Sequence, residues 1–228
     1  MKKYLLSFIL SVFIIVAGFS QQLVQVNYAN GSDLQYFSLN GSQDAILRIS
    51  STGSLLEYGV EREVSRFSYT SPNLMPFVGR VDLFGTEALP GLEGKVKSLG
   101  TTYINWYTNM DRDYQDGKIK SVGNTLLDYY SNFDDKAYAG KLKKIGGMEV
   151  TYYSSFDNVV LSGKLKSIGN IQVQYFSSFD DKLIQGKIKS IGNYNWQWYS
   201  GRDSRDYQGS IKSGSYRQAV NGIIFTII

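Results

Sequence analysis

A seven-residue segment that returns every 23 residues constrains this chain more than any other feature. GKVKSLG (94–100) recurs as GKIKSVG at 117, GKLKKIG at 140, GKLKSIG at 163 and GKIKSIG at 186, and a remnant, GSIKS, follows at 209. A fixed period of this size is typical of repeat architectures, in which each unit buries its apolar face against its neighbours. The sequence therefore predicts five regular repeats over 94–208. We expect a partial sixth repeat and a C-terminal cap strand over 209–228.

Each copy has a second half that completes a β-hairpin. INWYTNMD (104–111) recurs as LDYYSNFD, VTYYSSFD, VQYFSSFD and WQWYSGRD. Glycine, often followed by Asn, separates the two β-rich halves and is a hairpin turn signal. In a coiled solenoid the repeated lysines would stack at ~4.8 Å and repel, whereas hairpins keep them two strands apart. The predicted fold is all-β, an elongated antiparallel β-meander built from tandem 23-residue hairpins.

Strand alternation predicts which side chains are buried. With a three-residue hairpin loop, the aliphatic residue after the first lysine lies on the same face as the first aromatic of the second half. The phenylalanine near the end of the second half lies on this face too. The buried set is then Ile119, Leu142, Leu165, Ile188, Tyr129, Tyr152 and Tyr175. Lys118, Lys141 and Lys164 are expected to be exposed. The aliphatic residue before the hairpin glycine and the second aromatic of each repeat are placed on the outer face.

The flanking regions differ from the array. Residues 1–20 combine Lys2-Lys3, an apolar run and small residues, which predicts a signal peptide. Residues 21–93 are interpreted as a degenerate N-terminal repeat and capping region, in which GRVDLFG (79–85) imitates the first strand of a repeat. We therefore predict export to the periplasm, the cell surface or the medium, with no stable membrane insertion after signal cleavage.

Composition narrows the functional classes. The chain has no Cys and no His, so thiolate metal sites and the commonest general base are absent. Repeated turn carboxylates lack the asymmetry that catalysis needs, so we expect no enzyme, no catalytic residues and no cofactor. A net charge of +4 does not indicate a nucleic-acid partner. The aspartate column, with members such as Asp134 and Asp157, is interpreted as turn-forming, and calcium binding is its alternative.

Repeated rings and lysines form the predicted binding site. The second aromatic of each repeat and the first lysine are expected to share one outer face, where rings contact an extended partner and lysines attract acidic groups. The predicted contact residues are Tyr107, Tyr130, Tyr153, Phe176, Tyr199, Lys118, Lys141, Lys164 and Lys187.

The opening Tyr138-Ala-Gly140-Lys-Leu142, repeated as Tyr207-Gln-Gly209-Ser-Ile211, resembles MORN repeats in its 23-residue spacing and hairpin unit. The chain lacks that family's internal Gly-x-Gly. The resemblance implies an elongated hairpin array with a role in scaffolding and in protein or lipid contact. The style of the chain is also similar to exported repeat proteins of Bacteroidota.

The functional hypothesis is a non-enzymatic exported repeat scaffold that binds an envelope protein or a glycan. A purely structural spacer is the first alternative, and an outer-membrane β-barrel is the second.

Overall fold

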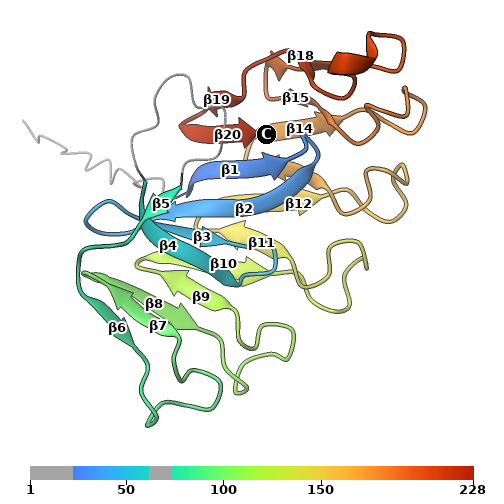
Figure 1. Cartoon of the computed structure of the whole chain (residues 1–228). Coiled ribbons are helices and arrows are strands. Elements are labelled where there is room, and N and C mark those ends of the chain that lie inside the picture. Colours follow the sequence, from blue (N-terminus) through green and yellow to red (C-terminus); the bar gives the residue numbers. More distant parts are fainter. Residues whose placement is uncertain (1–22, 62–72) are drawn as a thin grey trace, which may run out of the picture.

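The computed structural model describes residues 23–61 and 73–228 and shows an all-β protein with an antiparallel hairpin meander (Figure 1). The predicted signal peptide, residues 1–20, lies outside the described residues. Part of the predicted degenerate region, residues 62–72, does too.

The repeats form an 11-stranded sheet in which every strand pairs with its neighbours in the sequence. Its order is β16-β15-β14-β13-β12-β11-β10-β9-β8-β7-β6. The strands are β6 (Val81–Leu83), β7 (Val96–Leu99), β8 (Thr102–Trp106), β9 (Ile119–Val122), β10 (Thr125–Tyr129), β11 (Leu142–Ile145), β12 (Met148–Tyr152), β13 (Leu165–Ile168), β14 (Ile171–Tyr175), β15 (Ile188–Ile191) and β16 (Tyr194–Asn195). A separate pair, β17 (Gln197–Trp198) and β18 (Ile211–Ser213), extends the pattern into the remnant copy.

A second sheet joins the two ends of the chain. Its order is β19-β20-β1-β2-β3-β4-β5, and β20 runs parallel to β1. The strands are β1 (Leu23–Ala29), β2 (Asp33–Asn40), β3 (Ala45–Ile49), β4 (Leu55–Glu61), β5 (Leu74–Met75), β19 (Arg217–Val220) and β20 (Ile223–Ile227). Residues 23–61 therefore pair with one another, with β5 and with β20, and they do not add strands to the repeat sheet.

The second sheet covers the inner face of the repeat sheet, and one core fills the space between them (Figure 1). Two turns of the second sheet also bond to the repeats. The backbone N–H groups of Ile119 and Leu142 donate to the carbonyls of Gly53 and Ser51, and that of Ile188 donates to Gly31. The inner face of the array is thus closed by packing and by direct hydrogen bonds.

The predicted buried set is confirmed. Ile119, Leu142, Leu165 and Ile188 are fully buried, and the three tyrosines that share their face are at most 5% exposed. The loop length on which the prediction relied is wrong, because Val122 pairs with Thr125 across a two-residue turn. In this turn Gly123 has a φ of 53°, as the first residue of a type II′ turn requires.

A β-bulge reconciles the short turn with the buried face. Asp128 lies opposite Lys144 and Tyr129 lies opposite Leu142, so Lys143 is an extra residue without an opposite partner. The same shift recurs at the second lysine of each regular repeat. Because the bulge changes the alternation by one residue, aliphatic residues on both sides of it face inward. The residue before the hairpin glycine, such as Ile145, is therefore buried and not on the outer face as predicted.

The prediction that GRVDLFG (79–85) imitates the first strand of a repeat is wrong. Val81–Leu83 lies opposite Val96–Leu99 with the same bulge, so it occupies the place of a second strand and not of a first one. Phe84 then matches the second aromatic of a regular repeat, and the ammonium of Lys97 lies 5.8 Å from its ring centre.

We predict that Leu142→Ala destabilises the protein by ~2–4 kcal/mol, because the fully buried side chain leaves a cavity between two sheets. Chemical denaturation followed by tryptophan fluorescence measures this change. The control is Lys144→Ala, an exposed substitution expected within ~0.5 kcal/mol of the parent. Equal effects of the two substitutions would contradict the assignment of the inner face.

Candidate functional site

The loops between hairpins are closed by their own serine and aspartate side chains. In the loop at 131–139, Asp134 accepts hydrogen bonds from the backbone N–H and the hydroxyl of Ser131, at 2.6 and 2.7 Å. The corresponding aspartates of the other loops are Asp111, Asp157, Asp180 and Asp203, and they make the same pair of contacts. This geometry agrees with the turn-forming interpretation of the column. Within residues 23–61 and 73–228, no group of three or more acidic side chains is placed to hold a metal ion.

These contacts lower the pKa of the loop carboxylates. Hydrogen bonds from Ser131 lower the pKa of Asp134, and those from Ser154 lower the pKa of Asp157. For Asp203, hydrogen bonds from Lys212 and Ser200 lower the pKa to about 2. The charged forms of these aspartates are therefore favoured in the folded protein.

We predict that acid destabilises the array within a defined window. A carboxylate with a lowered folded pKa contributes stability above its unfolded pKa of ~3.9, and that contribution is lost as the pH falls through the folded pKa. The melting temperature should therefore fall between about pH 4 and pH 2, and Asp157→Asn should flatten part of this dependence. Asp113→Asn changes an exposed carboxylate outside the column and is the control. An unchanged pH profile for Asp157→Asn would contradict the prediction.

The first lysines are half-buried and bonded between repeats, which corrects the prediction that they are exposed. The ammonium of Lys118 donates to the carbonyl of Gly140 at 2.7 Å, and that of Lys141 donates to Gly163 at 2.7 Å. Lys164 and Lys187 reach the second sheet instead, at the carbonyls of Ser32 and Asn30. Each ammonium also lies within 6 Å of an inner aromatic ring. Burial accordingly lowers the pKa of Lys118, Lys141 and Lys187.

The second aromatics also connect neighbouring repeats. The hydroxyl groups of Tyr107, Tyr130 and Tyr153 donate to the carbonyls of Leu127, Val150 and Val173 in the next repeat, at 3.0–3.1 Å. The bulged lysine of the next repeat lies 5.0–5.7 Å from the ring centres of Tyr107, Tyr130, Tyr153, Phe176 and Tyr199.

These rings are therefore only partly accessible. The prediction that the second aromatics form an exposed strip is wrong, because each ring is partly buried between two repeats.

We predict that the triple substitution Tyr130→Ser, Tyr153→Ser and Phe176→Ser lowers the melting temperature sharply, because it removes the ring contacts of three successive repeats. Differential scanning calorimetry measures the effect. A triple variant of exposed residues on β12 and β14, Glu149→Ser, Gln172→Ser and Gln174→Ser, should melt close to the parent. Equal melting temperatures for the two variants would show that the rings do not hold the repeats together.

The residue just before the loop aspartate is exposed, contrary to the prediction that it faces the core. Phe133, Phe156 and Phe179 are 100%, 95% and 94% exposed, and Met110 in the first loop is 79% exposed. The spacing of the sequence contained the signal. Ser131 and Asp134 stand three residues apart and bond to each other, so the chain turns between them and strand alternation ends before Phe133.

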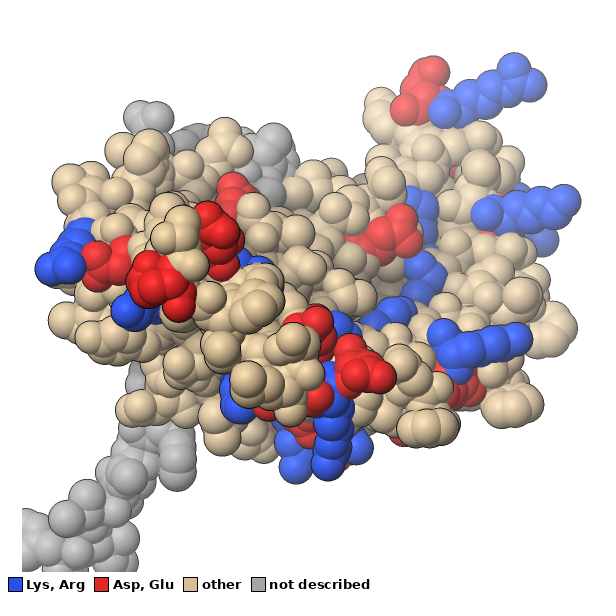
Figure 2. Space-filling view, turned by 90° about the horizontal axis from the view of Figure 1, so that it is seen from below, with Lys and Arg blue, Asp and Glu red and all other residues tan. Residues whose placement is uncertain are grey.

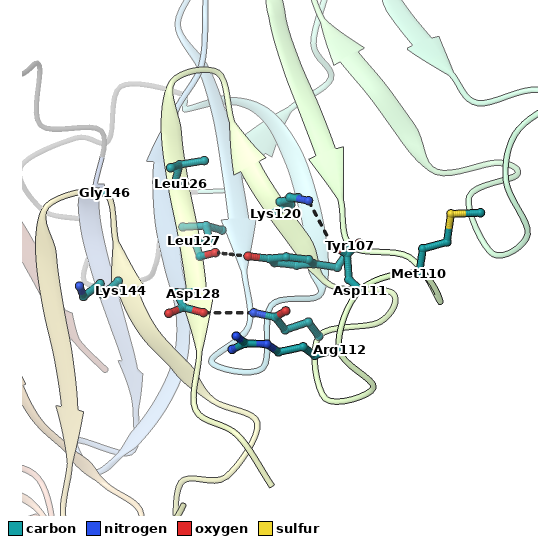
Figure 3. A pocket seen from close by; sticks show the side chains of 11 residues that line it. Tyr107, Met110, Asp111, Arg112, Lys120, Leu126, Leu127, Asp128, Lys144 and Gly146 are labelled. Atoms are coloured by element: carbon teal, nitrogen blue, oxygen red, sulfur yellow. Dashed lines mark hydrogen bonds and ion pairs between the residues drawn. The ribbon is translucent and has the colours of Figure 1, made fainter. Parts of the chain in front are cut away.

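A groove of about 820 Å³ lies on the outer side of the first three regular repeats (Figure 3). In the groove, the ring of Tyr107 lies between the side chains of Lys120 and Arg112. Asp128 points toward this side of the groove from β10. Leu126, 66% exposed, and Met110 add apolar surface. Two contacts order the polar groups: Gln115 donates to Asp128 at 3.1 Å, and Lys120 donates to Asp111 at 3.2 Å. The groove thus combines an aromatic ring, two apolar side chains and charges of both signs.

The groove coincides with a departure from the repeat. At the position of Gln115 the following repeats have Tyr138, Leu161, Ile184 and Tyr207. The ring of Tyr138 lies 4.6 Å from that of Tyr130, and the ring of Tyr207 lies 5.4 Å from that of Tyr199, so each covers the second aromatic of its own repeat. Gln115 donates instead to Asp128, and Tyr107 lines the open groove.

The predicted binding residues are therefore not gathered at one site. Tyr107 lies in the groove beside the missed residues Arg112, Gln115 and Asp128. Lys141 and Lys164 line a separate cavity of about 420 Å³ between the two sheets, together with Ser32, Asp33 and Ser51. Basic and acidic side chains are interspersed on the face seen in Figure 2, so the surface there does not favour a ligand of one charge.

Comparisons with known proteins identify no relative, so the function is argued from the structure alone. No protein-family model, no curated protein and no solved structure matches the chain. In the described part of the chain, no helix is long and apolar enough to cross a membrane.

Proposed function

We propose that the chain is a non-enzymatic, exported scaffold of the cell envelope that binds a protein segment or a glycan in the groove around Tyr107. The observation that carries this proposal is the coincidence of the groove with Gln115, the residue at which the first loop departs from the other loops. Repeats that serve only to stack have no need of such a departure. The resemblance to MORN repeats and the predicted signal peptide are in agreement with this role.

The chemistry of the groove favours an extended polar ligand. Its lining offers the guanidinium of Arg112, the ammonium of Lys144 and the carboxylate of Asp128 as hydrogen-bonding groups, with Tyr107 and Leu126 as apolar surface. Ligand sites in general combine apolar walls with a few well-placed polar groups. Peptides and oligosaccharides both present alternating polar and apolar surface.

A substitution that restores the repeat tests the proposal. Gln115→Tyr supplies the ring that Tyr138 supplies in the next repeat, and it should cover Tyr107 as Tyr138 covers Tyr130. We expect binding to cell-wall glycan or to an envelope protein to fall at least tenfold, while the melting temperature stays equal or rises. Co-sedimentation with purified cell-wall glycan and capture from envelope extract measure the two ligand classes separately.

Matched substitutions make the result specific. Arg112→Ala should also weaken binding, since its guanidinium lines the groove, whereas Arg205→Ala changes an exposed arginine of a distant loop and should not. If the parent binds in neither assay, or if Gln115→Tyr binds as well as the parent, the groove is not a ligand site. A structural spacer would then be the better account.

A further inference from the structure

Three phenylalanines at the tips of consecutive loops form a row with no role in closing those loops. We call Phe133, Phe156 and Phe179 the loop-tip row, and each is at least 94% exposed. The loops are closed by the serine and aspartate on either side, so the rings make no contribution to the turn. Exposed apolar side chains that recur together mark interaction surfaces more often than structural ones.

The fold fixes the spacing of the row. Equivalent residues of consecutive hairpins are two strands apart, which is ~9–10 Å. The loops project side by side from one end of the hairpins, on the right in Figure 1. A partner that contacts all three rings must therefore offer apolar groups at the same spacing. A second copy of this chain has that spacing by construction.

The charges around the row are symmetric about its centre. The loop of Phe133 carries Asp135 and Lys136, and the loop of Phe179 carries Asp181 and Lys182 in the same order. The central loop has Asn158 and Val159 at these positions, and Val159 is 80% exposed. Every loop carries the column aspartate, which is Asp157 in the central loop. Apart from that aspartate the central loop is uncharged, and it lies between two loops that each add one acidic and one basic residue.

We propose that the loop-tip row is a self-association surface that joins two copies of the chain about a two-fold axis near Phe156. In a symmetric dimer the same patch contacts itself, and a two-fold axis that crosses the row at Phe156 makes the two rows run antiparallel. Phe133 then lies opposite the partner's Phe179. Lys136 lies opposite the partner's Asp181, and Lys182 lies opposite the partner's Asp135. A parallel arrangement would instead place like loops together.

The area is sufficient for a specific contact. One aromatic side chain buries ~150–250 Å² in an interface, so three rings account for ~450–750 Å² on each copy. A standard interface buries ~800 Å² per partner, and Val159 lies between the outer two loops to add to the total. This surface is distinct from the groove, since none of its phenylalanines lines that groove.

Sedimentation velocity over a range of concentrations tests the association. The parent should be a reversible dimer, and Phe133→Ser with Phe156→Ser and Phe179→Ser should be a monomer with an unchanged melting temperature. Lys136→Glu with Lys182→Glu should weaken the dimer at least tenfold, because each lysine then faces an acidic group. A parent that stays monomeric at the highest concentration overturns the proposal and leaves the groove untouched.

Cysteine cross-linking tests the geometry, because the chain has no cysteine of its own. Val159→Cys, in the central loop, should form a disulfide-linked dimer under mild oxidation. Asn124→Cys, exposed in a hairpin turn at the other end of the repeat, should not. Equal rates for the two variants would contradict the two-fold arrangement. Gln115→Tyr should dimerise like the parent, so failure of ligand binding and failure of dimerisation remain distinguishable.

Discussion

The structure depends on the β-bulge at the second lysine of each repeat. Strands with strict alternation and a two-residue turn would place the aliphatic residues at Ile119 and Val122 on opposite faces. The bulge brings both inward, so five short hairpins present a continuous apolar surface. It also holds the second lysine outward, where its ammonium lies near the ring of the preceding repeat. One extra residue per repeat thus determines both faces of the sheet.

The apolar face produced in this way requires a cover, and the two ends of the chain provide it. Turns of the second sheet approach the repeats so closely that side chains do not fit. A Cβ at Gly31 would lie 1.9 Å from the ring of Trp198, and one at Gly53 would lie 2.2 Å from the hydroxyl of Tyr129. Both glycines also have positive φ, 62° and 86°. The covering sheet is therefore matched to individual repeats, and the array is not free to lengthen beneath it.

The sequence was informative where the repeat was regular. The period located every hairpin of the repeat array, and the recurrence of aliphatic and aromatic residues identified the buried face around Leu142 and Tyr152. The bulge could not be predicted, because a two-residue turn with a bulge and a three-residue turn without one bury almost the same residues. The exposure of Phe133 was missed for a local reason. Strict alternation through Ser131 would bury Phe133, but the hydrogen bonds between Ser131 and Asp134 end the strand. The pairing of β1 with β20 joins residues about 200 apart in the sequence, and no local pattern indicates such a contact.

The difference between repeated and unique features separates the two surfaces discussed for this chain. A side chain that recurs in every repeat is explained first by stacking, and the structure gives that explanation for Lys118 and Tyr130, which bond across repeats. Phe133, Phe156 and Phe179 recur without such a contact. Stacking therefore does not explain their regular spacing, whereas a partner with apolar groups at the same spacing would. Gln115 is the reverse case, because it interrupts a column that is otherwise apolar and lines the groove beside Tyr107. Under both proposals the logic is the same: a recurring exposed residue meets a recurring partner, and an interrupted column meets a single ligand.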